Sequence, residues 1–424
     1  MAGIVGITGM GILSSISNNI SEFKEAIKLG RSNFSMPETK QEPDWFCGIA
    51  AKIQNFSFLE KLNQLSNIPK EYLLKAKRLG QRAPFTVQIA ILTALEAWSN
   101  AGLFSKKQIP ERIGLIVASQ NSTRNYQYSL IPKFQKNPDY LSPRYALEFL
   151  ETNQIGILSE LLEIKGEGFV VGGASATGNV GLIKGFQSIK ADLYDLCLVV
   201  GVVADLSPME IQGFINSGAM GGKKFRYQPH KACRPFDIQH EGFIYGQAGG
   251  SIILESDTSA SVRKIRIQAE IKGGAIILDS NSSSNPNPDG EKKAMLSAIQ
   301  KSGCLTSDID YINTHGSSSP LGDQAEIDAI RQLFKSQIPK IWLNATKGLT
   351  GHCIYSAGIV EVIATVLQMN GSFLHPNKNL EEPICKELNF CGKEVMEKQI
   401  NTALSNSFGF GGINTSIVVK RSRM

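Results

Sequence analysis

The pattern that most constrains this chain is a short apolar run followed by a glycine-rich polar turn. In residues 169–185, Phe-Val-Val leads into the small residues Gly172 to Ala176, and apolar residues then recur at helical spacing. This order predicts a strand, a tight turn and a helix. Strands that alternate with helices through both halves predict a layered α/β fold. Three later segments have the same strand and turn form: residues 311–323, 342–352 and 406–412.

Ser175 stands where the predicted turn meets the predicted helix. The first N–H groups of a helix are unpaired and its dipole is positive there, so a side chain at this place lies beside donors that can hold negative charge. Serine is also a preferred N-cap residue. Ser175 is therefore either a reactive side chain or only the cap of the helix.

Length and composition indicate a large protein with two parts. The chain has 424 residues, of which 42% are hydrophobic and 19% are charged. Such a chain can bury a large core and is too long for one ordinary domain. The segment 256–264 has few apolar residues and is the expected boundary. We expect an N-terminal half of residues 1–258, which carries Ser175, and a C-terminal half of residues 259–424.

Charge and cysteine content argue against a nucleic-acid-binding protein and against a metal-binding protein. The net charge of +6 is mild, and no dense block of Lys and Arg with interleaved aromatic residues is present, so nucleic-acid binding has little support, whereas an acidic protein partner is compatible. The cysteines are odd in number and form no Cys-x-x-Cys pair, which indicates free thiols in a reducing compartment and argues against a zinc site or another metal centre. The seven are Cys47, Cys197, Cys233, Cys304, Cys353, Cys385 and Cys391.

No segment has the pattern of a targeting or membrane-spanning element. The N-terminus lacks a basic start before an apolar stretch, and the longest apolar run, Leu196–Ala204, is too short to cross a bilayer. We therefore expect a cytoplasmic protein without a membrane-spanning segment.

Local patterns predict the main elements. Residues 4–12 read as a strand that enters a glycine turn; its glycines lack the spacing of a dinucleotide fingerprint, so a nicotinamide site is disfavoured. Residues 31–75 and 126–142 are expected to be irregular, the latter because prolines interrupt a helix. Helices are predicted at residues 19–29, 84–101 and 290–301, and strands at residues 113–119, 196–203, 251–255 and 265–271.

Two of the five histidines lie in the glycine-rich turns of the second half. His315 and His352 each follow a predicted strand, and Lys347 precedes the second of them. A lone histidine is more often structural than catalytic. A structural role alone is a weaker explanation when two histidines, a lysine and Ser175 all lie in turns of the same form.

The chain resembles the β-ketoacyl-carrier-protein synthases, or ketosynthases, of the thiolase-like superfamily, nearly from end to end. The motifs that carry the resemblance are Ile7-Thr-Gly-Met-Gly11, Cys233-Arg-Pro-Phe-Asp237, Pro288-Asp-Gly290, His315-Gly with Pro320-Leu-Gly-Asp323, Lys347 with Gly351-His352, and Asn406-Ser-Phe-Gly-Phe-Gly-Gly412. The resemblance implies two similar α/β halves in a five-layered αβαβα fold and a homodimer. It also implies substrates carried as thioesters on the phosphopantetheine of an acyl carrier protein, with no cofactor bound by the enzyme itself.

The resemblance also implies roles for individual residues. His315 and His352 would donate hydrogen bonds to the thioester oxygen of a malonyl group, and a charged network would fix the two rings. The backbone N–H groups at the nucleophile position and at the glycine-rich gate would form an oxyanion hole. The residues assigned in this way are Lys347, Glu326 and Glu361 for the network, Ser175 and Phe410 for the oxyanion hole, Phe410 for the gate, and Ser317 and Ser319 for pantetheine contacts.

One departure from the family pattern decides the expected function. Where the family has a nucleophilic cysteine, this chain has Ser175. A helix N-terminus can bring a thiol into the thiolate range, whereas an alcohol needs a positioned base. We expect acyl transfer to Ser175 to be slow or absent, while decarboxylation, which needs only hydrogen-bond donors for the enolate oxygen, would persist.

The expected product is therefore acetyl-carrier protein. Family members with this serine and both histidines resemble the freestanding decarboxylases of polyketide β-branching cassettes, whose product is used by a hydroxymethylglutaryl-synthase-like enzyme. Three alternatives stay open: a condensing enzyme with a serine nucleophile, a non-catalytic partner resembling a chain-length factor, and a carrier-binding module without turnover. Gln247, where the family usually has a carboxylate, and Asn179-Val180 are further departures that do not touch the expected donors.

Overall fold

One mixed sheet of eleven strands runs through the computed structural model, which describes residues 3–36, 48–106 and 108–422. Its strand order is β12-β10-β9-β14-β15-β8-β1-β7-β5-β3-β4. In chain order these strands are β1 (Val5–Ser14), β3 (Ile113–Ala118), β4 (Gly168–Val171), β5 (Leu196–Gly201), β7 (Ala248–Ser256), β8 (Ala269–Leu278), β9 (Tyr311–Asn313), β10 (Trp342–Asn344), β12 (Asn389–Phe390), β14 (Thr402–Gly409) and β15 (Ile413–Arg421). The short pairs β2 (Ala50–Ala51) with β6 (Tyr245–Gly246) and β11 (Phe373–Leu374) with β13 (Met396–Glu397) lie outside this sheet.

The sheet contains the same arrangement twice. From β1 outward, β1 pairs antiparallel with β7, and β7 pairs antiparallel with β5. The next two pairs, β5 with β3 and β3 with β4, are parallel. From β8 outward, β8 pairs antiparallel with β15, and β15 pairs antiparallel with β14. The next two pairs, β14 with β9 and β9 with β10, are parallel. The two arrangements join where Val5–Ile7 of β1 pair antiparallel with Ala269–Ile271 of β8. The expectation of two similar halves is confirmed at the level of strand order, and the division at residue 258 stays a prediction.

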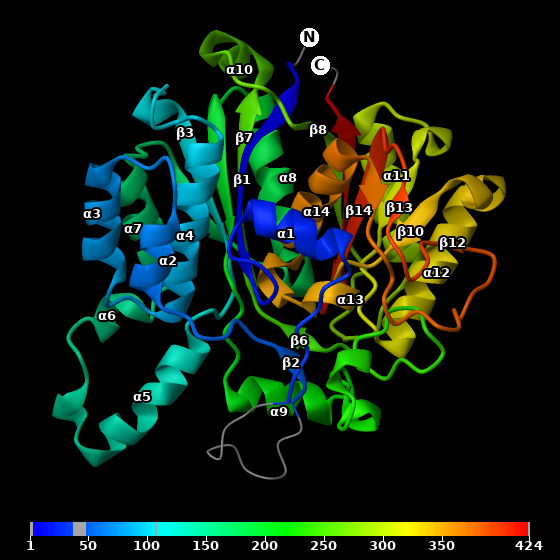
Figure 1. Ribbon diagram of the computed structural model, residues 1–424, viewed down its shortest axis with the longest axis horizontal. Helices are drawn as coiled ribbons and strands as arrows, with labels where there is room; N and C mark the ends of the chain where they lie inside the picture. Colours follow the sequence, from blue (N-terminus) through cyan, green and yellow to red (C-terminus); the bar gives the residue numbers. More distant parts are fainter. Residues whose placement is uncertain (1–2, 37–47, 107, 423–424) are drawn as a thin grey trace.

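Helices form three layers around the two parts of the sheet. Figure 1 shows α8 and α14 between the strands β1 and β7 on one side and β14 on the other, with α3, α4 and α7 outside the first part and α11 and α12 outside the second. The layers therefore alternate as αβαβα, as expected. The longer helices are α1 (Ile20–Lys28), α2 (Phe58–Gln64), α3 (Lys70–Gly80), α4 (Phe85–Asn100), α5 (Arg124–Lys136), α7 (Thr152–Leu162), α8 (Thr177–Lys190), α9 (Pro208–Asn216), α10 (Asp257–Arg263), α11 (Pro288–Ser302), α12 (Pro320–Phe334) and α14 (Ala357–Gly371); α6 (Tyr145–Glu148) and α13 (Lys347–Thr350) are single turns.

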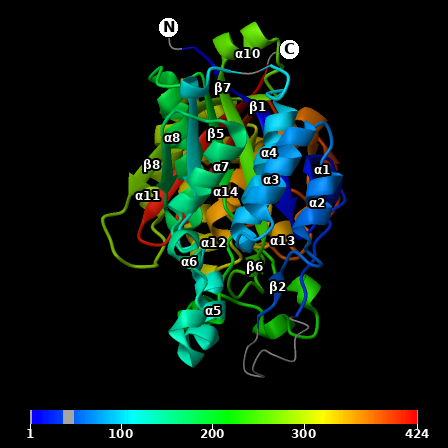
Figure 2. The ribbon, with the colours of Figure 1, turned by 90° about the vertical axis from the view of Figure 1, so that its left-hand side faces the viewer.

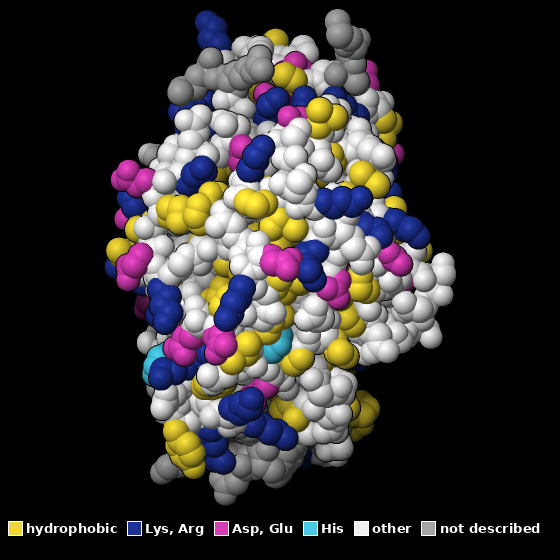
Figure 3. Space-filling model, turned by 90° about the vertical axis from the view of Figure 1, so that its right-hand side faces the viewer, with side chains coloured by type: hydrophobic (Ala, Val, Ile, Leu, Met, Phe, Trp, Pro, Cys, Tyr) yellow, Lys and Arg dark blue, Asp and Glu magenta, His cyan; other side chains and the backbone are white. Residues whose placement is uncertain are grey.

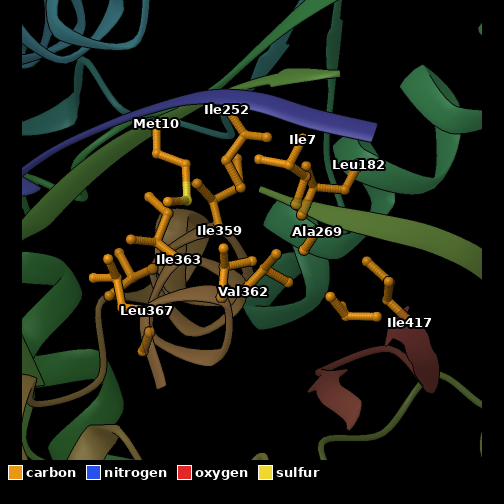
Figure 4. Packing of buried hydrophobic residues seen from close by; sticks show 14 of the residues in the cluster. Ile7, Met10, Leu182, Ile252, Ala269, Ile359, Val362, Ile363, Leu367 and Ile417 are labelled. Atoms are coloured by element: carbon orange, nitrogen blue, oxygen red, sulfur yellow. The ribbon is translucent and has the colours of Figure 1, made fainter. Parts of the chain in front are cut away.

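The central layer is apolar on all sides because both parts of the sheet cover it. Helix α14 is buried along almost its whole length. Its residues Ile359, Val362 and Ile363 pack near Met10 of β1 and Ile417 of β15 (Figure 4). A helix that is hydrophobic all round is typical of such a buried position. This core fixes the N-termini of α8 and α14 relative to one another.

The strand predicted within residues 4–12 is confirmed, but the glycine turn predicted there is wrong, because residues 5–14 all belong to strand β1. A Cβ at Gly9 would lie 2.2 Å from the Ala97 carbonyl oxygen, and one at Gly11 would lie 2.1 Å from the Thr93 carbonyl oxygen. The glycines therefore let α4 approach the strand closely. They have no role in a phosphate-binding turn.

Three other local predictions need correction. Residues 37–47 lie outside the described residues, and the rest of the range 31–75 is not wholly irregular, because α2 and the start of α3 lie there. Residues 126–142 contain most of α5, which continues through Pro132. The strand predicted at residues 265–271 begins later, as β8. The segment 256–264 contains α10, and its role as the boundary between the halves stays a prediction. Helix α5 projects from the body of the protein (Figures 1 and 2), so its one proline and its polar residues reflect exposure rather than the absence of a helix.

The distribution of surface charge and the state of the cysteines match what the composition predicts. On the face beside α11 and α12, Lys and Arg side chains are interspersed with Asp and Glu (Figure 3). Six cysteines are free thiols, and Cys47 lies outside the described residues. Within the ranges given above, none of the helices is long and apolar enough to span a membrane.

Candidate active site

The strand-end turns of both halves meet at one cavity of about 600 Å³. The sequence-predicted residues Ser175, His315, His352 and Phe410 line it, together with the two serines at 317 and 319. Segments that are far apart in the chain thus converge because the carboxyl ends of β4, β9, β10 and β14 face the same region. Convergent polar groups in an otherwise apolar cavity are typical of a ligand site.

Ser175 lies in a tight turn between β4 and α8. Ala174 has φ of 49°, and a short 3-10 turn at Ala174–Ala176 leads into α8. The Ser175 hydroxyl lies 2.9 Å from His352 Nε2. The interpretation of Ser175 as a helix cap is therefore wrong, because its side chain contacts the histidine and makes no capping bond in α8.

The hydrogen bonds of His352 determine which ring nitrogen carries its proton. The Ile354 backbone N–H donates to His352 Nδ1 at 3.1 Å. Burial, and then the charge of Lys347, lower the pKa of His352 well below its usual value, so the ring is neutral. A neutral ring that accepts at Nδ1 carries its proton on Nε2. His352 therefore donates its hydrogen bond to Ser175, and it is not placed to accept the Ser175 proton.

His315 presents the same nitrogen to the cavity with different support. Its Nδ1 lies 3.3 Å from Lys347 Nζ and 3.4 Å from the Phe408 N–H. Burial, then Lys347 and His352, lower the pKa of His315 well below its usual value. Its Nε2 is therefore also a donor, and the two ring centroids are 5.5 Å apart. The arrangement provides two N–H donors for one acceptor oxygen.

Lys347 is the charged group behind His315. It is fully buried, forms an ion pair with Glu361, and donates to the His315 carbonyl oxygen at 2.6 Å. The Ser407 hydroxyl donates to the other oxygen of Glu361 at 3.2 Å. Burial raises the pKa of Glu361, and Lys347 opposes that effect. Breaking this pair would leave a buried charge without compensation, which is strongly destabilising.

Glu326 holds the backbone of the His315 turn instead of joining the lysine network. Its carboxyl oxygens accept the N–H groups of His315 and Gly316 at 2.9 and 2.8 Å, and the side-chain amide of Asn406 at 3.0 Å. Burial raises the pKa of Glu326 to about 7. The single network that was expected for Lys347 with both glutamates is thus two separate sets of contacts.

The glycine-rich turn after β14 packs directly against the Ser175 turn. A Cβ at Gly409 would lie 2.4 Å from the Gly173 carbonyl oxygen. The next residue, Phe410, lies in the cavity wall with its side chain 42% exposed. Only glycine permits this approach, so the end of β14 lies against the backbone of the Ser175 turn.

Ser317 and Ser319 line the same cavity on the side of α12. The Ser319 hydroxyl also caps α12 by accepting the Gly322 N–H at 3.4 Å. Gln247, the unusual residue noted in the sequence, accepts the Ile53 N–H and donates to the Tyr245 hydroxyl, so it supports the fold. Among the described residues no group of three His, Cys, Asp or Glu side chains could hold a metal ion.

Sequence reasoning missed several residues of the site. Ile354 has φ of 51°, unusual for a β-branched residue, and nothing in the sequence marks it. Asn406 and Ser407 lie in a recognised motif, but their contacts with the glutamates required the tertiary structure. Glu291 also lines the cavity; it follows the Pro288-Asp-Gly290 segment, which could have drawn attention to it.

Comparisons with known proteins show the family to which the chain belongs. Family models for the β-ketoacyl synthase N-terminal and C-terminal domains match residues 3–260 and 268–381. The polyketide biosynthesis malonyl-ACP decarboxylase PksF of Bacillus subtilis (strain 168) is 34% identical over 98% of this chain and 96% of its own length. The 3-oxoacyl-[acyl-carrier-protein] synthase 1 of Buchnera aphidicola subsp. Schizaphis graminum (strain Sg) is 31% identical over 98% of this chain and 99% of its own length.

Solved structures share the fold at lower sequence identity. The AntDE:AntF complex of a ketosynthase with its acyl-carrier protein has a TM-score of 0.86 at 23% identity, and each chain is covered completely. A β-ketoacyl synthase from Burkholderia phymatum STM815 has a TM-score of 0.83 at 24% identity. The match covers 99% of this chain and 100% of the other.

Proposed function

This chain belongs to the β-ketoacyl synthase family, and we propose that it removes CO2 from malonyl-acyl carrier protein to give acetyl-acyl carrier protein, without a condensation step. The observation that carries the proposal is the hydrogen bond between Ser175 and His352. Because His352 Nδ1 accepts the Ile354 N–H, its Nε2 donates to Ser175. An alcohol without a base to take its proton is a weak nucleophile toward a thioester.

The same donors suit loss of CO2. When the malonyl carboxylate leaves as CO2, the electron pair of the broken bond moves into the thioester and places negative charge on its oxygen. In the free enzyme the His352 Nε2–H donates to Ser175; with substrate bound, it and the His315 Nε2–H would both donate to the thioester oxygen, and neither needs to transfer a proton to stabilise it. Their lowered pKa values keep both rings neutral, so each remains a hydrogen-bond donor of fixed orientation at neutral pH. Ser175 carries no acyl group in this reaction, so the enolate gains a proton.

The curated relative PksF, a malonyl-ACP decarboxylase of polyketide biosynthesis, supports this activity. We further propose that the reaction serves polyketide β-branching, where a hydroxymethylglutaryl-synthase-like enzyme would use the acetyl-carrier protein. The condensing enzyme from Buchnera favours one alternative, a β-ketoacyl synthase that condenses through Ser175. That alternative requires an acylated serine, and the direction of the His352 hydrogen bond argues against it.

The carrier protein would deliver its phosphopantetheine through the open side of the cavity. Ser317 and Ser319 would contact the pantetheine, since both residues line the cavity. Phe410 would act as the gate, and its backbone N–H would share an oxyanion hole with that of Ser175. The close packing of Gly409 on Gly173 supports this pairing. The enzyme itself would need no bound cofactor.

A homodimer is part of the proposal. Strand β4 ends the sheet order, so one of its edges pairs with no other strand among the described residues. Phe169, Val170 and Val171 of this strand are only half-buried. An apolar edge strand is a liability unless another chain covers it. A second copy paired at β4 would cover it.

The test is mass spectrometry of malonyl-loaded carrier protein incubated with the enzyme. We expect acetyl-carrier protein to accumulate, with no adduct on Ser175. Persistence of the malonyl form would contradict decarboxylation, and a mass increase on Ser175 together with β-keto products would favour the condensing alternative. Ser175→Cys is the matched variant, because a thiol in this turn should become acylated by a reactive acyl thioester.

A further inference from the structure

Decarboxylation leaves one chemical requirement that the two donors do not meet. Once CO2 has left, the α-carbon of the enolate must receive a proton before the acetyl product can form. This question rests on the proposed function, because it arises only if malonyl thioester is the substrate. The donor must lie in the cavity wall and must carry a proton that it can lose.

The two histidines and the lysine do not qualify. Each neutral ring has a single N–H, at Nε2, and its loss would leave an imidazolate beside an Nδ1 that already accepts a hydrogen bond. Lys347 is fully buried behind His315, where it is paired with Glu361 and bonded to the His315 carbonyl oxygen. These groups hold the enolate oxygen and its donors in place, and none of them has a proton to give to carbon.

The Ser175 hydroxyl has the required proton. Its oxygen accepts the His352 Nε2–H at 2.9 Å, so its own hydrogen is not used in that contact. A thioester oxygen held by the two histidines would have its α-carbon two bonds away, and the Ser175 hydroxyl, 2.9 Å from His352 Nε2, lies within reach of that carbon. We propose that the Ser175 hydroxyl donates the proton that converts the enolate into the acetyl group.

The step balances without an additional oxidant or reductant. The enolate electron pair forms a C–H bond at the α-carbon while the O–H bond of Ser175 breaks, because a carbanion is a much stronger base than an alkoxide. Once the α-carbon is protonated, the thioester oxygen loses its charge and the His352 N–H can return to the Ser175 alkoxide, which also lies at the N-terminus of α8; both features favour negative charge. A water molecule in the open cavity then returns a proton to Ser175, and its hydroxide combines with CO2 as bicarbonate.

Glu291 is the rival donor and must be tested beside Ser175. It lies in the first turn of α11, lines the same cavity, and is only 1% exposed. One of its carboxyl oxygens has no hydrogen-bond partner among the described residues. Burial and the neighbouring carboxyl groups of Glu326 and Asp279 raise the pKa of Glu291 well above its usual value, which favours its protonated form.

The first experiment compares single-turnover rates of acetyl-carrier protein formation in four proteins. We expect Ser175→Ala to lower the rate by about 10²-fold or more, as for removal of a general acid, with little change in KM. Glu291→Gln and the control Ser217→Ala should keep the wild-type rate. Ser217 lines the cavity too, but its hydroxyl is bonded to the Phe214 carbonyl oxygen. A wild-type rate in Ser175→Ala, or a loss confined to Glu291→Gln, would overturn the inference.

The second experiment separates proton donation from a structural role. Ser175→Gly leaves space for a small alcohol, so ethanol and the more acidic trifluoroethanol should partly restore its rate, the latter to a greater extent. A loss that neither alcohol restores would make Ser175 a positioning residue for His352 and overturn the inference. If the wild-type enzyme itself leaves malonyl-carrier protein unchanged, the proposed function fails; if it releases acetyl-carrier protein while the variants behave as wild type, only this inference fails.

Discussion

His315 and His352 face the same cavity with their ring centroids 5.5 Å apart, yet their Nδ1 atoms are held by different means. His315 lies against a buried ammonium that a carboxylate neutralises, whereas His352 accepts the backbone N–H of Ile354. The first arrangement uses charge, and the second uses a backbone conformation that costs about 1–3 kcal/mol in strain. Both give a neutral ring with its proton at Nε2. Similar catalytic donors can therefore depend on the stability of the fold to very different extents.

The largest expected effect is on stability and concerns the buried ion pair of Lys347 and Glu361 beside His315. Lys347→Met leaves Glu361 buried without its partner and should lower the free energy of unfolding by about 3–5 kcal/mol, as measured by chemical denaturation. Adding Glu361→Gln removes the uncompensated charge and should restore part of that stability. If Lys347→Met were as stable as the wild type, the buried pair would not support His315 as described.

The second prediction concerns the ring held by the backbone. His352→Ala should lower the rate of acetyl-carrier protein formation by about 10²–10³-fold, because one preorganised donor is lost. Its loss of stability should be smaller than that of Lys347→Met, since no buried ion is left unpaired. Rate and denaturation measurements on the same preparations test the contrast, and an equal loss of stability in both variants would contradict it.

The third prediction follows from the lowered pKa of His352. In the unfolded chain a histidine binds a proton below about pH 6.5, whereas the folded ring stays neutral there. The unfolded state then binds more protons, so this contribution to stability is present above pH 6.5 and is lost as the pH falls. His352→Gln removes it.

Denaturation at two pH values tests this sign. The stability of the wild type relative to His352→Gln should decrease between pH 7.5 and pH 5.5 by about 1 kcal/mol, given about 1.4 kcal/mol per pH unit for one full proton. A difference that stays constant or grows on acidification would contradict a neutral buried ring.

The smallest expected effect tests the outer part of the lysine network. Ser407→Ala removes one hydrogen bond to Glu361 and should cost about 1 kcal/mol in unfolding free energy. The rate should change by less than about 10-fold, because Lys347 and the Phe408 N–H still hold His315. A loss as large as that of Lys347→Met would mean that the serine, rather than the lysine, dominates the environment of Glu361.

The sequence by itself determined the family, the layered fold and the residues that meet in the cavity. Strand-end turns rich in glycine are local features, and they held Ser175, His315 and His352 in motifs that could be recognised without a structure. The replacement of a thiol by an alcohol at residue 175 is also visible in the sequence, and its chemical consequence follows from general acidity. Elements were misplaced where burial overrode local pattern, as for the glycines of β1 packed on α4.

Only the tertiary structure decided which hydrogen bonds and ion pairs connect the residues of the site. Which histidine nitrogen carries the proton depends on the Ile354 and Phe408 N–H groups, and which carboxylate pairs with Lys347 depends on how α14 and β14 pack. Hydrogen bonds between residues distant in the chain have no local signature, because they exist only once the core has fixed the two central helices. The same packing turned Ser175 from a possible helix cap into the partner of His352.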